Sequence, residues 1–144
     1  MTRRAALCGV AVLLLSLAVP SAGQNEERYK VRLSTVPMDV AMRSTVAGTG
    51  AATAVLKGTT MTVTGTFDGL LFAATTARVH RGAAMGVRGA SFADLAVSKA
   101  QKGTISGSIT LVPEQVQGLR KGQLYLQISS EKAPDGNLWG WFVR

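Results

Sequence analysis

The chain is dominated by stretches in which apolar and polar residues alternate one by one. The clearest stretch covers residues 60–67. Met61, Val63 and Phe67 there alternate with four threonines. Residues 104–111 repeat the pattern, with serines and threonines against isoleucine, glycine and leucine. Because successive side chains of a β-strand point to opposite faces, both stretches predict half-buried strands.

Six further segments have a weaker strand pattern: Tyr29–Val36, Gly50–Leu56, Leu71–His80, Ser91–Val97, Gln123–Ser130 and Leu138–Val143. Turn formers separate them, among them Asp68-Gly69 and Pro134-Asp135-Gly136. Only Pro113–Leu119 predicts a helical turn, and residues 24–28 predict a short solvated arm. Eight short strands without a long helix between them favour an all-β fold with antiparallel pairing. We expect a Greek-key β-sandwich or a partly closed barrel of about eight strands.

The first 23 residues have the pattern of a signal peptide. Arg3 and Arg4 precede an apolar stretch, Ala5–Val19, which ends in small and polar residues. At about 15 residues this stretch is shorter than the roughly 20 that span a bilayer, so cleavage after Gly23 is favoured over an uncleaved anchor. We therefore expect residues 24–144 to form one secreted or periplasmic domain with no membrane span. Cys8 is the only cysteine, so this domain is free of disulfides.

The domain is basic. The chain has 16 lysines and arginines against 8 acidic residues, and without Arg3 and Arg4 the net charge is +6. For an exported protein this favours an extracellular or envelope protein, or an anionic polymer, as partner over nucleic acid. The alternative is that scattered basic residues only keep the surface soluble.

Catalytic motifs are absent from the sequence. His80 is the only histidine, and neither a phosphate loop nor a serine-nucleophile motif occurs. We expect no enzyme activity and no cofactor, with His80 in a structural or surface role. The alternative is a small-ligand-binding or hydrolytic domain centred on His80 and nearby arginines.

Two other features are candidates for binding. Trp139 and Trp141 share one strand face, where packing at the edge of the sheet is favoured over an exposed platform for sugar rings. The segment RGAAMGVRG contains Arg81 and Arg88 and is either an anion-binding loop or a long connection.

The order of four segments resembles the CHRD domain, a module named after the repeats of chordin and common in bacterial exported proteins. These segments are GTTMTVTGTFDGL, TTARVHRGAAMGVRG, KGTISGSITL and LRKGQLYLQISSEKAPDGNLWGWFV, and the resemblance extends over about Tyr29 to Val143. The family's Ala–His–x–His–Gly element is matched by Ala77 to His80 with Gly82. Its C-terminal pattern is matched by Gly122, Leu124, Tyr125, Pro134, Gly136 and Gly140. The resemblance implies a non-catalytic binding or structural module.

The departures from the family pattern fall on its three frequent histidines. Arg78 replaces the first, His80 keeps the second, and Ser129 stands where the third is expected. By alternation Arg78 and His80 share one strand face, and Tyr125, Gln127 and Ser129 share another, so in typical members the faces could converge as a metal-holding cluster. Here we expect no metal site. The residues expected to bind a partner are Arg78, His80, Arg81, Arg88, Tyr125, Ser129, Trp139 and Trp141.

Overall fold

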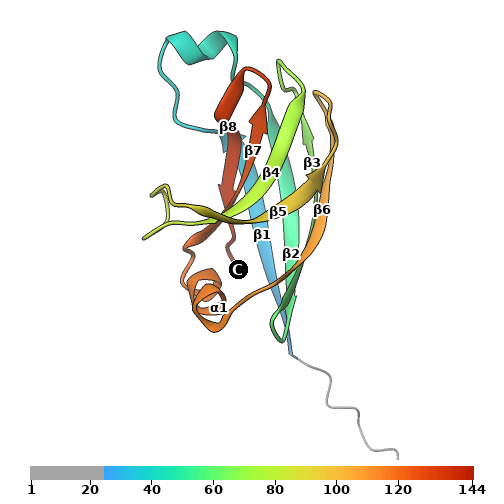
Figure 1. Ribbon diagram of the computed structural model, residues 1–144, viewed down its shortest axis with the longest axis vertical. Coiled ribbons are helices and arrows are strands. Elements are labelled where there is room, and N and C mark those ends of the chain that lie inside the picture. Colours follow the sequence, from blue (N-terminus) through green and yellow to red (C-terminus); the bar gives the residue numbers. More distant parts are fainter. Residues whose placement is uncertain (1–24) are drawn as a thin grey trace, which may run out of the picture.

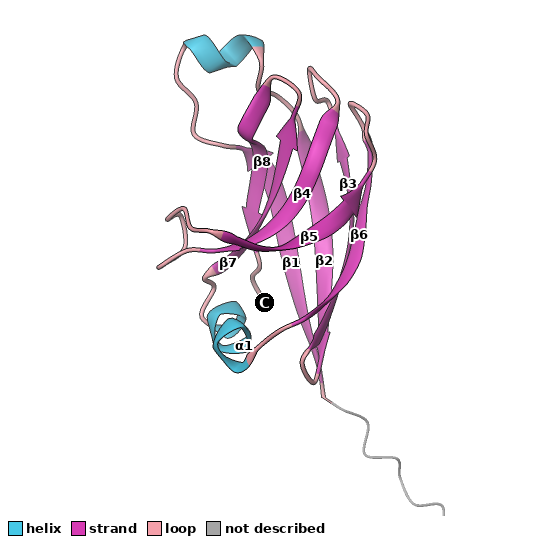
Figure 2. Ribbon diagram, viewed as in Figure 1, coloured by secondary structure: helices cyan, strands magenta, loops and turns pink. Residues whose placement is uncertain are grey.

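Eight antiparallel strands close into a barrel in the computed structural model, which describes residues 25–144 (Figure 1). The strands are β1 (Glu26–Thr35), β2 (Thr49–Lys57), β3 (Thr60–Asp68), β4 (Ala74–Arg81), β5 (Ser91–Val97), β6 (Gly103–Thr110), β7 (Leu124–Ser130) and β8 (Ala133–Trp141). A 3-10 turn, η1 (Ala41–Ser44), follows β1, and a helix, α1 (Pro113–Arg120), follows β6. Figure 2 shows η1 and α1 at opposite ends of the barrel.

The strands follow one another around the barrel in the order β1-β2-β3-β6-β5-β4-β7-β8. Because β3 pairs with β6 instead of β4, strands β4 to β6 turn back as a Greek key. The predicted all-β, antiparallel Greek-key fold is confirmed, in its barrel form. Two joints are short: β5 meets β6 over two paired positions, and β1 meets β8 through Ser34–Trp139, Thr35–Leu138 and an isolated bridge between Lys30 and Val143.

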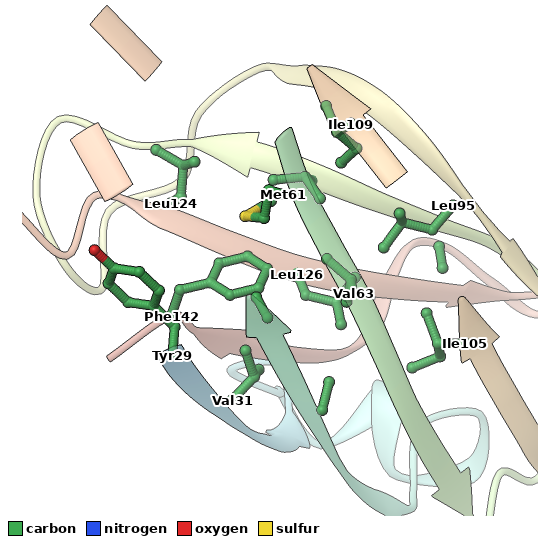
Figure 3. Packing of buried hydrophobic residues seen from close by; sticks show 14 of the residues in the cluster. Tyr29, Val31, Met61, Val63, Leu95, Ile105, Ile109, Leu124, Leu126 and Phe142 are labelled. Atoms are coloured by element: carbon green, nitrogen blue, oxygen red, sulfur yellow. The ribbon is translucent and has the colours of Figure 1, made fainter. Parts of the chain in front are cut away.

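The side chains of β3 point to the predicted faces of the strand. Met61 and Val63 are fully buried, whereas Thr62 and Thr64 are exposed. Figure 3 shows apolar side chains from strands far apart in the sequence meeting inside the barrel. Gly65 also faces inward, and a Cβ at that position would stand 2.6 Å from the Cβ of Ala52. The glycine in the pattern therefore lets β2 and β3 approach each other inside a filled barrel.

Several predicted boundaries are wrong. Residues 26–28 belong to β1 instead of a solvated arm. The Pro134-Asp135-Gly136 segment is not the turn before the last strand, because the chain turns at Glu131 and Lys132 and the three residues belong to β8. Gly136 has a φ of +129° there and lies against the side chain of Gln127. The 3-10 turn η1 was not predicted.

Other predictions are confirmed. Gly69 has a φ of +78° in the turn at Asp68-Gly69, and α1 begins at Pro113 as expected. The predicted signal peptide and Cys8 lie outside the described residues. None of the helices formed by residues 25–144 is long and apolar enough to cross a membrane.

A charged network joins α1 and the residues after β8 to the start of β1. Arg120 donates from Nε and Nη2 to Glu27 at 2.8 to 3.2 Å, and Arg144 lies 2.9 Å from the same carboxylate. The hydroxyl of Tyr29 donates to Glu27 Oε2 at 2.6 Å. Hydrogen bonds from Arg120 and Tyr29 are the largest causes that lower the pKa of Glu27 from 4.5 to about 2. The carboxylate is thus ionised at neutral pH and holds three separate parts of the chain.

Candidate functional site

The candidate site lies on the outer face of β4 and β7. Ala77 and Val79 point into the barrel, so Arg78 and His80 point outward. The strand register places Arg78 opposite Gln127 and His80 opposite Tyr125. It also places Thr76 opposite Ser129. The two faces that alternation defined in the sequence therefore form one continuous surface.

A polar cleft of about 290 Å³ opens on this surface, and we call it the β4–β7 cleft. Its lining residues are Thr76, Arg78, His80, Arg88, Gly89, Tyr125, Gln127, Ser129, Pro134 and Asp135. One wall is the loop between β4 and β5, which carries Arg88 and Gly89, and another is the start of β8. Because these walls cover the outer side of β7, all seven residues of that strand are buried.

His80 is held in one orientation. Its ring stacks on Tyr125 with centroids 4.8 Å apart and planes 16° from parallel. Its Nδ1 lies 2.9 Å from the carbonyl oxygen of Gly89. A carbonyl only accepts, so Nδ1 carries the hydrogen and Nε2 is an acceptor in the neutral ring. Burial lowers the pKa of His80 from 6.5, the charges of Arg78 and Arg88 lower it further, and the Gly89 bond opposes them. The imidazole is therefore neutral at neutral pH.

Two guanidinium groups line the cleft, and the charge of one of them, Arg78, is partly offset by its ion pair with Asp94. Arg78 donates from Nε to Asp94 Oδ1 at 2.8 Å. Arg88 donates from Nη1 to the carbonyl oxygen of Asp135 at 3.0 Å and lies 5.4 Å from the ring centroid of Trp139. These hydrogen bonds engage one nitrogen of each guanidinium. Since a guanidinium has five N–H donors in all, both groups retain donors for an anion.

Tyr125 and Gly89 fix the loop against the strands. The hydroxyl of Tyr125 accepts from the Gly89 amide at 3.0 Å and donates to the Gly89 carbonyl at 3.1 Å. A Cβ on Gly89 would stand 1.7 Å from the carbonyl oxygen of Arg81, so this close approach requires glycine. The sequence pointed to the loop but gave no signal for Gly89. It also gave no signal for Thr76 and Asp135, because only the folded loop and hairpin bring them to the cleft.

Trp139 and Trp141 lie beside the cleft. Their ring centroids are 5.7 and 4.5 Å from that of Tyr125 and 5.8 Å from each other. Trp139 also packs on a small cluster that contains Val36 and Val46. Both indoles keep part of their surface exposed. They pack on the barrel wall, the arrangement that the sequence favoured, and each presents the remaining surface to solvent.

Arg81 is separate from these residues. It is exposed, pairs in register with Leu124, and lies next to Gly118 of α1 instead of lining the cleft. The sequence left open whether the segment of Arg81 and Arg88 binds an anion or only connects two strands, and of these two arginines only Arg88 lines the cleft.

The cleft does not fit a transition metal. Within residues 25–144 no three or more His, Cys, Asp or Glu side chains are grouped so that they could hold an ion. The cleft contains one imidazole and two guanidinium groups, and the guanidinium groups repel a metal cation.

Comparison with known proteins gives one match. The CHRD domain family matches residues 29–141, a range that extends from β1 to the end of β8 and includes the cleft. No curated protein and no solved structure matches the chain. Because the family covers most of its length, the chain belongs to the CHRD domain family.

Proposed function

We propose that this CHRD domain is a non-catalytic, exported binding module that holds an anionic group of an envelope or extracellular partner in the β4–β7 cleft. The observation that carries the proposal is that Arg78 and Arg88 line one polar cleft together with a neutral, fixed imidazole. In a partly enclosed polar cleft, guanidinium groups with unused donors bind carboxylate and similar oxyanions by charge-assisted hydrogen bonds. The basic composition supports the same class of partner.

The geometry disfavours a hydrolytic role. A serine nucleophile needs its base within about 3 Å. The register places His80 opposite Tyr125, whereas Ser129 lies four residues further along β7. At roughly 3.3 Å per residue, Ser129 lies about 13 Å along β7 from the position opposite His80. The Nδ1 of His80 is also bonded to Gly89 and not to a carboxylate that would orient a catalytic base.

The single histidine makes the proposal directly testable. The proton resonances of His80 are followed by NMR against pH in tag-free protein, with and without galacturonate, at constant ionic strength. An anion bound beside the arginines offsets their charge, so we expect the pKa of His80 to rise when galacturonate is present. Arg88→Gln should abolish most of this rise, whereas Lys57→Gln, at the end of β2 and three strands away from β7 around the barrel, should not. Identical titration curves with and without galacturonate would contradict the proposal.

A further inference from the structure

The outer surface that carries the cleft continues across β8 onto β1. Ser34 lies opposite Trp139 and Lys30 lies opposite Val143. Because the pairing is antiparallel, the position between them places Arg32 opposite Trp141. Val31 and Leu33 are buried in the barrel, so Lys30 and Arg32 point outward, on the same side as the two indoles.

Cationic and aromatic side chains therefore follow one another across four adjacent strands. One row consists of His80 on β4, Tyr125 on β7, Trp141 on β8 and Arg32 on β1. Neighbouring strands are about 4.8 Å apart, so this row extends over roughly 14 Å. Trp139 and Arg88 lie on one side of the row and Lys30 on the other. We call Arg88, Trp139, Trp141, Arg32 and Lys30 the cross-strand track.

Within the described part of the chain, the cations at the β1 end of the track have no ion-pair partner. Among residues 25–144, Arg28 is paired with Glu26, and Arg120 and Arg144 are paired with Glu27. No carboxylate of the same residues lies within 4 Å of the charged groups of Lys30 or Arg32. The track thus has positive charge at both ends, with two partly exposed indoles between them.

We propose that the cross-strand track binds a linear acidic polysaccharide, an inference that rests on the proposed function of the cleft. One sugar carboxylate occupies the cleft beside Arg88, and a later carboxylate of the same chain pairs with Arg32 and Lys30. The sugar rings between them lay their C–H faces on Trp139 and Trp141. These indoles are already ordered by edge and tilted contacts with Tyr125, so binding costs little side-chain entropy.

An acidic peptide fits the same surface less well. It supplies carboxylates for the arginines and lysine, but its flexible acidic side chains offer no flat apolar face to the indoles. A polysaccharide of uronic acids supplies carboxylates and flat apolar sugar faces in regular succession along one chain. Charge accounts for attraction to either polymer, and the indoles favour the sugar.

The experiment compares oligogalacturonate with its neutral carboxyl-reduced form and with polyglutamate, by calorimetry and by tryptophan emission. Both tryptophans of the chain lie on the track, so emission reports its occupation. We expect oligogalacturonate to change the emission and to bind at least tenfold more tightly than either other polymer. Arg32→Gln and Lys30→Gln should each weaken this binding about three- to tenfold, and Lys57→Gln, at the far end of β2, should leave it unchanged.

The outcomes separate this inference from the proposed function. If galacturonate shifts the pKa of His80 but oligogalacturonate binds no more tightly than the monomer, the cleft binds anions and the track is overturned. The track is also overturned if polyglutamate binds as tightly as oligogalacturonate and if Trp141→Phe and Trp141→Ala bind oligogalacturonate as tightly as the unmodified protein does. If neither galacturonate nor its oligomer shifts the pKa, both proposals fail. Thermal unfolding checks that each variant is folded, and Trp141→Phe keeps a ring against Tyr125 should the alanine variant not fold.

Discussion

Replacing Phe67 by alanine is expected to lower the free energy of unfolding by about 3 kcal/mol. Phe67 is 3% exposed and belongs to the main hydrophobic core of the barrel. A phenylalanine that buries about 150 Å² contributes about 4 kcal/mol at 25 cal/mol per Å², and alanine retains roughly one methyl group of this. Phe67 also lines an open surface hollow beside Leu33 and Gly103, so the new cavity connects to solvent. Water can enter such a cavity, which places the loss at the lower end of the usual 3–5 kcal/mol.

The matched controls are Thr62→Ala and Thr64→Ala on the opposite face of β3. Both threonines are exposed, and the 3.2 Å contact of Thr62 Oγ1 with Ser108 Oγ lies at the surface. Each change should cost under about 1 kcal/mol. Urea unfolding of the three variants measures the difference, provided the slopes of the transitions agree. Equal losses, or a larger loss at either threonine, would refute the strand register, because a shift by one residue exchanges the two faces.

Three further predictions concern other parts of the molecule. The pKa of Glu27 is lowered in the fold from 4.5 to about 2, so the network stabilises the fold above about pH 5 and this contribution is lost as the pH falls towards 2. Glu27→Gln should lower the free energy of unfolding at pH 7 by about 1–2 kcal/mol, after allowance for the exposed arginines. It should also make the fall in stability with decreasing pH less steep, and an unchanged pH profile would contradict this. Gly140→Ala should lower the free energy of unfolding by about 2 kcal/mol or more, because its Cβ would stand 2.4 Å from the carbonyl oxygen of Arg32. Thermal unfolding measures this loss, and an unchanged stability would show that β1 and β8 pack less closely than described. Tag-free protein should contain no stoichiometric zinc or copper after gel filtration, and elemental analysis that finds either metal would disprove the reasoning from Arg78 and Ser129.

The sequence was sufficient to predict strands and their faces. Alternation is a local property, so Met61 inside and Thr62 outside follow directly from the period of a strand. It was also sufficient to place Arg78 beside His80 on one face. Strand order is not local, and nothing in the alternation of β3 indicates that its neighbour is β6 instead of β4. The closed barrel and the pairing of β4 with β7 were therefore not predictable from periodicity alone.

The candidate site was predicted in part for a similar reason. Arg78, His80, Tyr125 and Ser129 lie on paired strands, and their faces could be inferred. The cleft also needs the loop after β4, whose position depends on Gly89 lying against the backbone of Arg81. That glycine and its neighbours predict only flexibility when considered as sequence. Arg78 and Arg88 line the same cleft only because tertiary contacts hold the loop against the strands.

The joint between β1 and β8 also determines when the barrel can be completed. The N-terminal strands are made first, and β1 to β3 can pair early as a meander of neighbouring strands. The remaining partner of β1 is β8, which is made after all the other strands. Until then β1 has unpaired backbone groups along one edge and an uncovered apolar face, the combination that recruits strands from other chains. Synthesis that stops before β8 would therefore leave a product prone to aggregation instead of a smaller folded domain.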